Sequence, residues 1–200
     1  MYTRHRPVTA LASLGLAALL TVAPAAGQEH AGHDAMMPDT GLRADLLTDL
    51  GFLEEKYTSL AEAMTEHYAW RPGEGVRSVS EVFMHIAGAN LFIPTLFGVA
   101  PPAGMEVASM QEAFGRMQEM EQITDPAEVM ERLRAGLEHA RHAIASVPDE
   151  ELDTEITMFG QQATKRAGLI LLVTHMHEHL GQAVAYARSN GVVPPWSAGG

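Results

Sequence analysis

The chain has 200 residues, an acidic composition and no cysteine. Its 25 Asp and Glu outweigh 13 Lys and Arg, which gives a formal net charge of −12. A charge of this sign lacks the basic footprint of proteins that bind DNA or RNA, so we expect no nucleic-acid partner. The absence of cysteine excludes a disulfide framework, a lipoprotein anchor, a thiolate metal site and a cysteine nucleophile.

Residues 1–27 have the order of parts found in a secretory signal peptide. A basic head, Arg4-His-Arg6, precedes an uncharged stretch at 7–22 and small residues at 23–27. The apolar stretch is shorter than the roughly 20 residues that a membrane-spanning helix needs, although an uncleaved anchor is the alternative. We expect cleavage, no stable membrane anchor afterwards, and an exported protein, periplasmic or secreted. Without the two arginines the formal charge becomes −14.

Residues 28–39 show no apolar periodicity and are predicted to be a flexible tail. The tail contains His30, His33, Met36 and Met37, side chains that bind soft metals such as copper, although short His and Met tails are often incidental. We expect the folded domain to occupy residues 40–196.

The first half of this domain carries two apolar stripes with a period of 3.6 residues, which predict two long helices. The first helix is expected over 40–70. The second begins at Ser78, where Glu81 completes a capping box, and it fades at Gly98. Pro94 lies inside the second stripe and should kink or shorten the last turn.

The second half predicts a short Met-rich helix at 107–120 and two further long helices at 125–148 and 164–190. Asp125 is the expected N-cap of the third long helix. Between the last two helices the period falls towards two at 154–160, which indicates a short extended segment. Four long amphipathic helices predict an all-α fold, an up-down four-helix bundle with a short extra helix or loop after the second helix.

Histidines are concentrated on the last predicted helix. On a helical wheel His175, His179, Gln182 and Tyr186 share one face, which is also apolar, whereas His177 points away. Two histidines four residues apart can reach one metal ion. Two core histidines bonded to backbone or carboxylate groups would produce the same spacing, so the wheel leaves both interpretations open.

A third metal ligand would have to come from another helix. His85 is the best candidate, because the small residues Gly88 and Ala89 beside it leave room for an ion and a substrate. His67 is the second choice. His139 and His142 are interpreted mainly as solvated residues on the third long helix.

Two motifs resemble the DinB/YfiT-like superfamily of four-helix bundles. The segment 175–182 has the pattern His-x3-His-x-Gly-Gln of that family's last helix, and it is followed by Tyr186 and by Gly-Val-Val-Pro-Pro at 191–195. The segment 78–85 resembles the second-helix motif that carries a further metal histidine. The resemblance covers about 42–196 and implies that His85, His175 and His179 bind a divalent metal. Many members have another histidine where this chain has Glu178.

The same residues also satisfy the pattern His-x-x-Glu-His of inverted zinc peptidases, in which the glutamate is the general base. Those enzymes are larger and take a further acidic ligand downstream, whereas no acidic residue follows His179 here. This alternative is therefore disfavoured. Glu178 still lies beside the ligand face, where it could touch a metal-bound water.

Three imidazoles leave a coordination position for water or substrate, which is typical of catalytic metal sites. We therefore expect a metal-dependent hydrolase or transferase of small molecules, with Glu178, Gln182 and Tyr186 as candidate catalytic residues. The resemblance adds that some family members transfer low-molecular-weight thiols. Because such thiols are mainly cytosolic, export favours hydrolysis.

The alternative is a non-catalytic metal-binding or stress-related bundle in the cell envelope, in which the metal joins the second and last helices. A catalytic role predicts an accessible cleft roofed by residues 99–123, whereas a structural role predicts no open cavity at the metal. Zinc and nickel are the metals most expected, and imidazole also suits iron and copper. A homodimer through the Met-rich surface is compatible with both roles.

Overall fold

The computed structural model describes residues 38–197. The predicted signal peptide, 1–27, and most of the predicted tail, 28–39, lie outside this range. The helices are α1 (Gly41–Ala63), α2 (Val79–Phe92), α3 (Met110–Met120), α4 (Pro126–Ser146) and α5 (Lys165–Ser189). The strands are β1 (Glu155–Met158) and β2 (Gln161–Thr164), and the 3₁₀ helices are η1 (Thr65–His67), η2 (Ile93–Phe97), η3 (Asp149–Glu151) and η4 (Pro195–Ser197).

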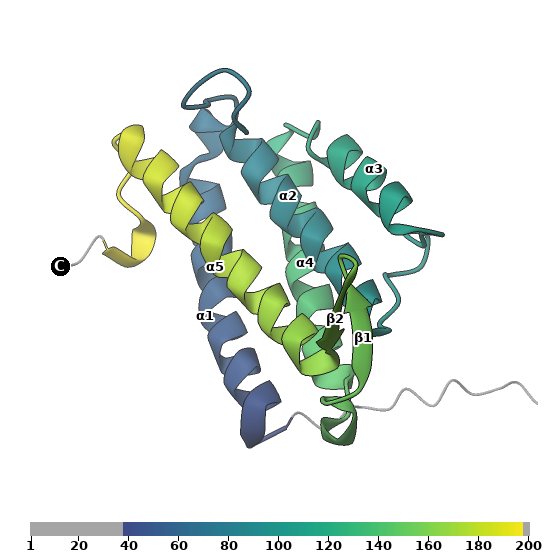
Figure 1. The fold of residues 1–200 in the computed structure, drawn as a ribbon. Helices are drawn as coiled ribbons and strands as arrows, with labels where there is room; N and C mark the ends of the chain where they lie inside the picture. The colour runs from purple at the N-terminus through teal and green to yellow at the C-terminus, as the bar shows by residue number, and fades with distance from the viewer. Residues whose placement is uncertain (1–37, 198–200) are drawn as a thin grey trace, which may run out of the picture. The chain divides into compact units, whose positions relative to one another are not determined.

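Helices α1, α2, α4 and α5 pack around one apolar core, and α3 packs on α2 (Figure 1). The helix directions along the chain are up, down, down and up (Figure 1). Helices α2 and α4 run in the same direction because α3 and its loops carry the chain back between them. The predicted all-α four-helix bundle with a short extra helix after the second helix is thus confirmed, but the helix directions do not alternate strictly as the expected up-down order would have them.

Helix α2 is the central helix of the bundle. All of its residues are buried except Glu81 and His85. The segment Val79–Phe97 is apolar and long enough to cross a membrane by composition alone, but 78% of that window is buried inside the bundle, as expected for a core helix. The predicted capping box is present, since the Ser78 hydroxyl accepts from the Glu81 amide and the Glu81 carboxylate accepts from the Ser78 amide. This cap fixes where the central helix begins.

The prediction of one helix over 40–70 is wrong at its end, because α1 stops at Ala63. The chain continues as the 3₁₀ helix η1, and the Tyr68 hydroxyl then donates a hydrogen bond to the Ala61 carbonyl at 3.0 Å. The expected effect of Pro94 is confirmed: α2 ends before it, and η2 carries the chain to Gly98, which has a φ of 92°.

The predicted extended segment is a β-hairpin. Strands β1 and β2 are antiparallel, with Met158 opposite Gln161. The two turn residues, Phe159 and Gly160, have φ angles of 50° and 79°, the signature of a type I′ turn. The hairpin leads directly into α5, whose N-cap is Thr164.

We predict that Gly136→Ala destabilises the bundle. A Cβ atom at this position in α4 would lie 2.7 Å from the Ala87 carbonyl oxygen and 2.8 Å from the Ala87 Cα atom in α2. These are backbone atoms at a helix crossing, so relief requires the two helices to separate. We expect the free energy of unfolding, measured by urea denaturation, to fall by about 1–3 kcal/mol.

The matched control is Gly115→Ala in α3, where a Cβ atom would meet nothing within 4 Å. Because alanine is the better helix former, this change should raise the free energy of unfolding by up to about 1 kcal/mol. Equal effects of the two substitutions would contradict the close approach of α2 and α4.

Candidate metal centre

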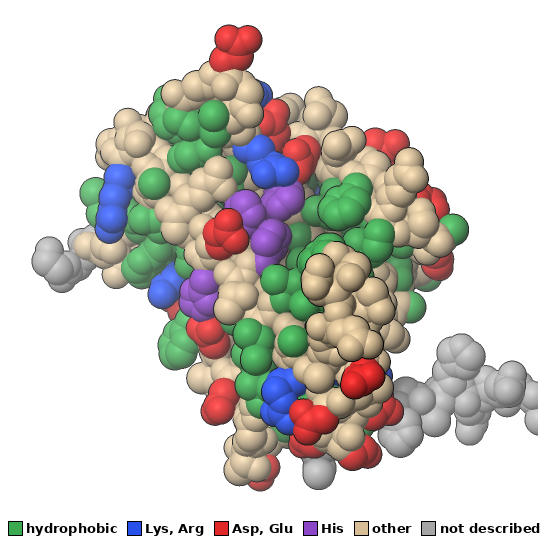
Figure 2. All heavy atoms as spheres, in the orientation of Figure 1, with side chains coloured by type: hydrophobic (Ala, Val, Ile, Leu, Met, Phe, Trp, Pro, Cys, Tyr) green, Lys and Arg blue, Asp and Glu red, His purple; other side chains and the backbone are tan. Residues whose placement is uncertain are grey.

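Three histidines from two helices meet at one point of the bundle surface. His85 comes from α2, and His175 and His179 come from α5, one turn apart. One ring nitrogen of each lies within 4.8 Å of the other two. The three pairs of ring centroids are 4.6–5.3 Å apart. Figure 2 shows histidine side chains gathered in one patch at the centre of this face.

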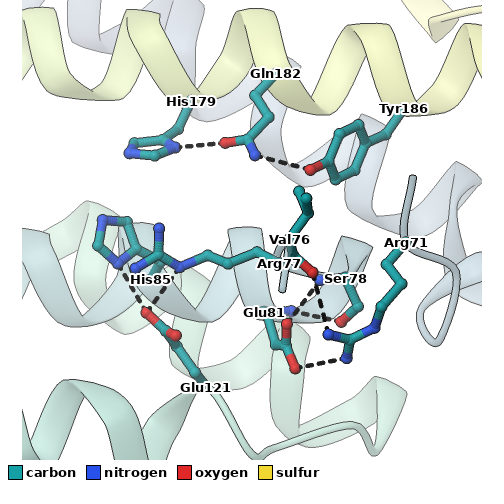
Figure 3. A network of polar contacts seen from close by, with 10 residues as sticks. All are labelled: Arg71, Val76, Arg77, Ser78, Glu81, His85, Glu121, His179, Gln182 and Tyr186. Carbon is teal, nitrogen blue, oxygen red and sulfur yellow. Dashed lines mark hydrogen bonds and ion pairs between the residues drawn. The ribbon is translucent and has the colours of Figure 1, made fainter. Parts of the chain in front are cut away.

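His85 is oriented by Glu121, which follows α3. The His85 Nδ1 atom lies 2.8 Å from Glu121 Oε1, and Arg77 Nε donates to the same oxygen at 3.0 Å (Figure 3). Burial tends to raise the pKa of Glu121, but the hydrogen bond from His85 and the charge of Arg77 hold that pKa below its usual value. An ionised carboxylate accepts only, so His85 Nδ1 carries the proton. The lone pair of His85 Nε2 is left for a metal.

His179 is oriented by a second chain of hydrogen bonds along α5 (Figure 3). Its Nδ1–H donates to Gln182 Oε1 at 2.8 Å, and Gln182 Nε2 donates to the Tyr186 hydroxyl at 2.9 Å. The Tyr186 ring packs edge-on against Trp70, with 5.3 Å between centroids. As with His85, the Nε2 lone pair of His179 is free to bind a cation.

His175 is the most deeply perturbed of the three histidines. Burial, reinforced by the nearby His179, His85 and Arg77, lowers the pKa of His175 to about 4. Burial is also the largest cause of a lowered pKa at His179. Both rings are therefore neutral at pH 7, the state in which imidazole binds metals.

The donor set fits a divalent metal ion. Within residues 38–197, His175 Nδ1 is a buried nitrogen with no hydrogen-bond partner. A buried polar atom without a hydrogen-bond partner costs free energy. A cation bound by all three rings would remove the cost of packing imidazoles together without such partners. A three-histidine group such as this one can hold a metal ion, and imidazole alone does not select which metal.

Of the other residues predicted from the sequence, some lie on the face of the three histidines and some do not. Gln182 and Tyr186 lie on the ligand face as the wheel predicted, whereas the exposed His177 turns away to Asp49 Oδ2, 2.7 Å distant. The side chain of Glu178 is exposed. His67, in η1, is not part of the histidine group. The catalytic roles suggested for Glu178, Gln182 and Tyr186 stay predictions.

The interpretation of His139 as a solvated residue is wrong. Its side chain belongs to the buried set, with 7% of its surface exposed, and burial lowers its pKa. The loop 100–102 and His142 line the same cavity, so the loop covers a face of α4 that the wheel alone assigned to solvent. His142 is exposed, as predicted.

The sequence did not single out Glu121 and Arg77 as functional residues. Glu121 lies 36 residues after His85, beyond the predicted end of the Met-rich helix, and no local periodicity connects the two. Arg77 directly precedes the capping box. Only a general rule points to a residue such as Glu121: metal-binding histidines commonly donate their second N–H to a carboxylate.

Two hollows flank the histidines. A polar groove of about 520 Å³ is lined mainly by charged and amide side chains, Arg71, Arg77, Glu81, Glu121 and Gln182 among them. An apolar cavity of about 150 Å³ includes His85 and His175 in its wall, together with Met110, Phe114 and Met117 from the α3 region. The site is thus accessible and is covered on one side by α3. Three residues of the segment 99–123 therefore lie in the wall of the cavity that His85 and His175 border.

Comparisons with known proteins agree with this fold. The family model of the DinB superfamily matches residues 50–183. The crystal structure of a DinB-like protein from Bacillus cereus superposes with a TM-score of 0.56 and 18% sequence identity, covering 75% of this chain and 93% of that one. This likeness concerns the fold alone. No curated protein matches the chain.

We predict that His175→Ala abolishes stoichiometric metal binding by the purified protein. Removal of one of three ligands leaves two imidazoles, which hold a divalent ion far more weakly. Metal content after dialysis against trace zinc, measured by inductively coupled plasma mass spectrometry, should fall from about one ion per chain to well below that value.

The matched control is His177→Ala, which removes an exposed histidine from the opposite side of the same helix. This variant should retain the full metal content. Stoichiometric metal in His175→Ala, or an equal loss in both variants, would show that the ion is held elsewhere.

Proposed function

The chain belongs to the DinB superfamily, and from this premise we propose that it is a metal-dependent enzyme acting on small molecules. The reaction class is hydrolysis or group transfer, and the metal is held by His85, His175 and His179. The observation that carries the proposal is that three histidine rings converge and that two of them, His85 and His175, line an apolar cavity. Zinc or nickel is the expected metal, and iron or copper would also suit the ligands.

Accessibility distinguishes this proposal from a purely structural metal. Structural zinc sites have four protein ligands and no open position, whereas catalytic sites have three and leave a place for water or substrate. The group found within residues 38–197 has three histidines. The second candidate, a non-catalytic bundle in which the metal joins α2 and α5, is favoured by the unpaired His175 nitrogen but does not explain the two adjoining hollows.

The residues around the rings supply orientation. Glu121 and Arg77 fix His85, while Gln182 and Tyr186 fix His179, so both Nε2 atoms are held towards the centre. A divalent cation bound there would lower the pKa of a coordinated water and polarise a carbonyl group. Gln182 and Tyr186 act through His179 and are positioning residues.

Glu178 is the candidate proton acceptor. It is adjacent in sequence to His179, and its charge acts to raise the pKa of that histidine. Its side chain is exposed. An exposed carboxylate beside the ligands is available to accept a proton from the attacking group.

Hydrolysis is preferred over thiol transfer because we also propose that the chain is exported. The order of basic, apolar and small residues in 1–27 supports export, and low-molecular-weight thiols are mainly cytosolic. Intact-mass measurement of the protein recovered from the cell envelope tests this point. A mature chain should begin just after Ala25 or Gly27, and an intact Met1 would contradict cleavage of the signal peptide and favour an uncleaved anchor.

We predict that the zinc-loaded protein hydrolyses at least one class of activated ester. In a panel of p-nitrophenyl esters, the rate should exceed that of His175→Ala by about 100-fold or more, since the metal supplies both water activation and charge stabilisation. Removal of the metal with a chelator should abolish the activity, and added zinc should restore it.

A parallel assay with a small thiol and an electrophilic acceptor tests transfer. Turnover in neither assay, or equal turnover by the wild type and His175→Ala, would contradict an enzymatic role and leave the non-catalytic bundle as the better description. Thermal stabilisation by metal does not separate the two, because any ligand that binds only the folded state raises the melting temperature.

A further inference from the structure

We propose that the substrate of the histidine centre carries an apolar group of about the size of a benzene ring, and that this group binds in the apolar cavity beside His85 and His175. The inference rests on the proposed function, since it names the class of molecule that reaches the metal ligands. It assigns Ala89 and Phe159 as residues that determine specificity.

The cavity adjoins the ligands directly, because the rings of His85 and His175 form part of its wall. Apart from these two rings, all of its lining side chains are apolar, including Ala89, Phe92 and Met117. Its volume is about 150 Å³. A volume of about 150 Å³ is enough for an apolar cavity to accept benzene. The only polar atoms that a bound molecule can meet there are those of the imidazoles, so its polar group must lie at the metal centre.

Phe159 gives a second, independent reason to connect the cavity with function. Its φ angle of 50° lies in the left-handed region, which is unfavourable for a bulky residue and normally taken by Asn or Gly in this type of turn. The phenyl ring is 58% exposed, so core packing does not require it. Yet it lines the cavity. Backbone strain of this kind is typically retained at functional sites.

Phe114 contributes a second exposed ring to the same cavity, from α3. Half of its surface is exposed. Two phenylalanines from separate elements thus border one small cavity at the protein surface. Figure 2 shows hydrophobic side chains directly beside the histidine patch. Such an arrangement suits an apolar ligand group, which would cover the two rings when bound.

The polar groove differs from the apolar cavity in being lined mainly by charged and amide side chains. Its arginines are each paired with a carboxylate: Arg71 with Glu81 at 2.9 Å, and Arg77 with Glu121 at 3.0 Å (Figure 3). The groove therefore offers no unpaired cation for an anionic group, and its wall includes Glu121 and Gln182, the hydrogen-bond partners of His85 and His179. The proposed apolar group occupies the cavity and not this groove.

A pair of metal-binding probes tests this arrangement. Acetohydroxamate and benzohydroxamate share the same two zinc-binding oxygens and differ in that one carries a methyl group and the other a phenyl ring. Calorimetric titration of the zinc-loaded protein should give a Kd for benzohydroxamate that is at least about tenfold lower than for acetohydroxamate, because the ring is removed from water.

Two variants test whether the preference for benzohydroxamate arises in the apolar cavity. Ala89→Leu places a larger side chain in the cavity, and Phe159→Asn removes one ring while supplying a residue suited to the turn. Each should raise the benzohydroxamate Kd and so bring the two Kd values within about twofold of one another. The control Ala185→Leu makes the same change at an exposed position of α5 and should retain the tenfold preference. Should Ala89→Leu fail to fold, Phe159→Asn decides alone.

The outcomes separate this inference from the proposed function. Equal Kd values in the wild type, or a preference for the phenyl ring that persists in Phe159→Asn, would overturn the cavity assignment and leave the metal enzyme intact. Failure of both hydroxamates to bind the zinc-loaded protein would contradict an open metal position, and with it both proposals.

Discussion

Three imidazole rings lie against one another between α2 and α5, and burial disfavours the protonated form of two of them, His175 and His179. Each nitrogen of a buried neutral imidazole needs a hydrogen-bond partner or a metal ion. The surrounding residues supply hydrogen-bond partners for only some of these nitrogens. Glu121 takes the proton of one ring and Gln182 that of another, whereas His175 keeps a buried nitrogen unpaired among the described residues. A shared cation satisfies all three rings at once. Helix α3 brings Glu121, the residue after its last turn, to His85 in the middle of α2.

The environment of the rings differs sharply between its two sides. On one side lie paired charges, and on the other an apolar cavity bordered by Phe114 and Phe159. A metal bound beside such a cavity could hold a reactive polar group while the apolar part of the substrate is removed from water. Helix α3 and the hairpin supply the two exposed rings that border this cavity.

Prediction from the sequence succeeds where the information is local. The four-residue spacing of His175 and His179, the capping box before α2 and the period change at the hairpin are all set by neighbouring residues. It fails where contacts join distant segments. The bond between His85 and Glu121 and the loop over His139 leave no periodic trace, and the end of α1 depends on Tyr68 folding back onto Ala61. The motif that contains His85 and the small residues beside it predict His85 as the third metal ligand.

The central claim is that the three histidines bind one metal ion together, and X-ray absorption spectroscopy of the zinc-loaded protein tests it most directly. The account predicts three imidazole nitrogens at about 2.0–2.1 Å and a further light-atom ligand. His85→Ala should reduce the imidazole shell by one ring. A zinc ion with fewer than two imidazoles, or an imidazole shell unchanged by His85→Ala, would contradict the account.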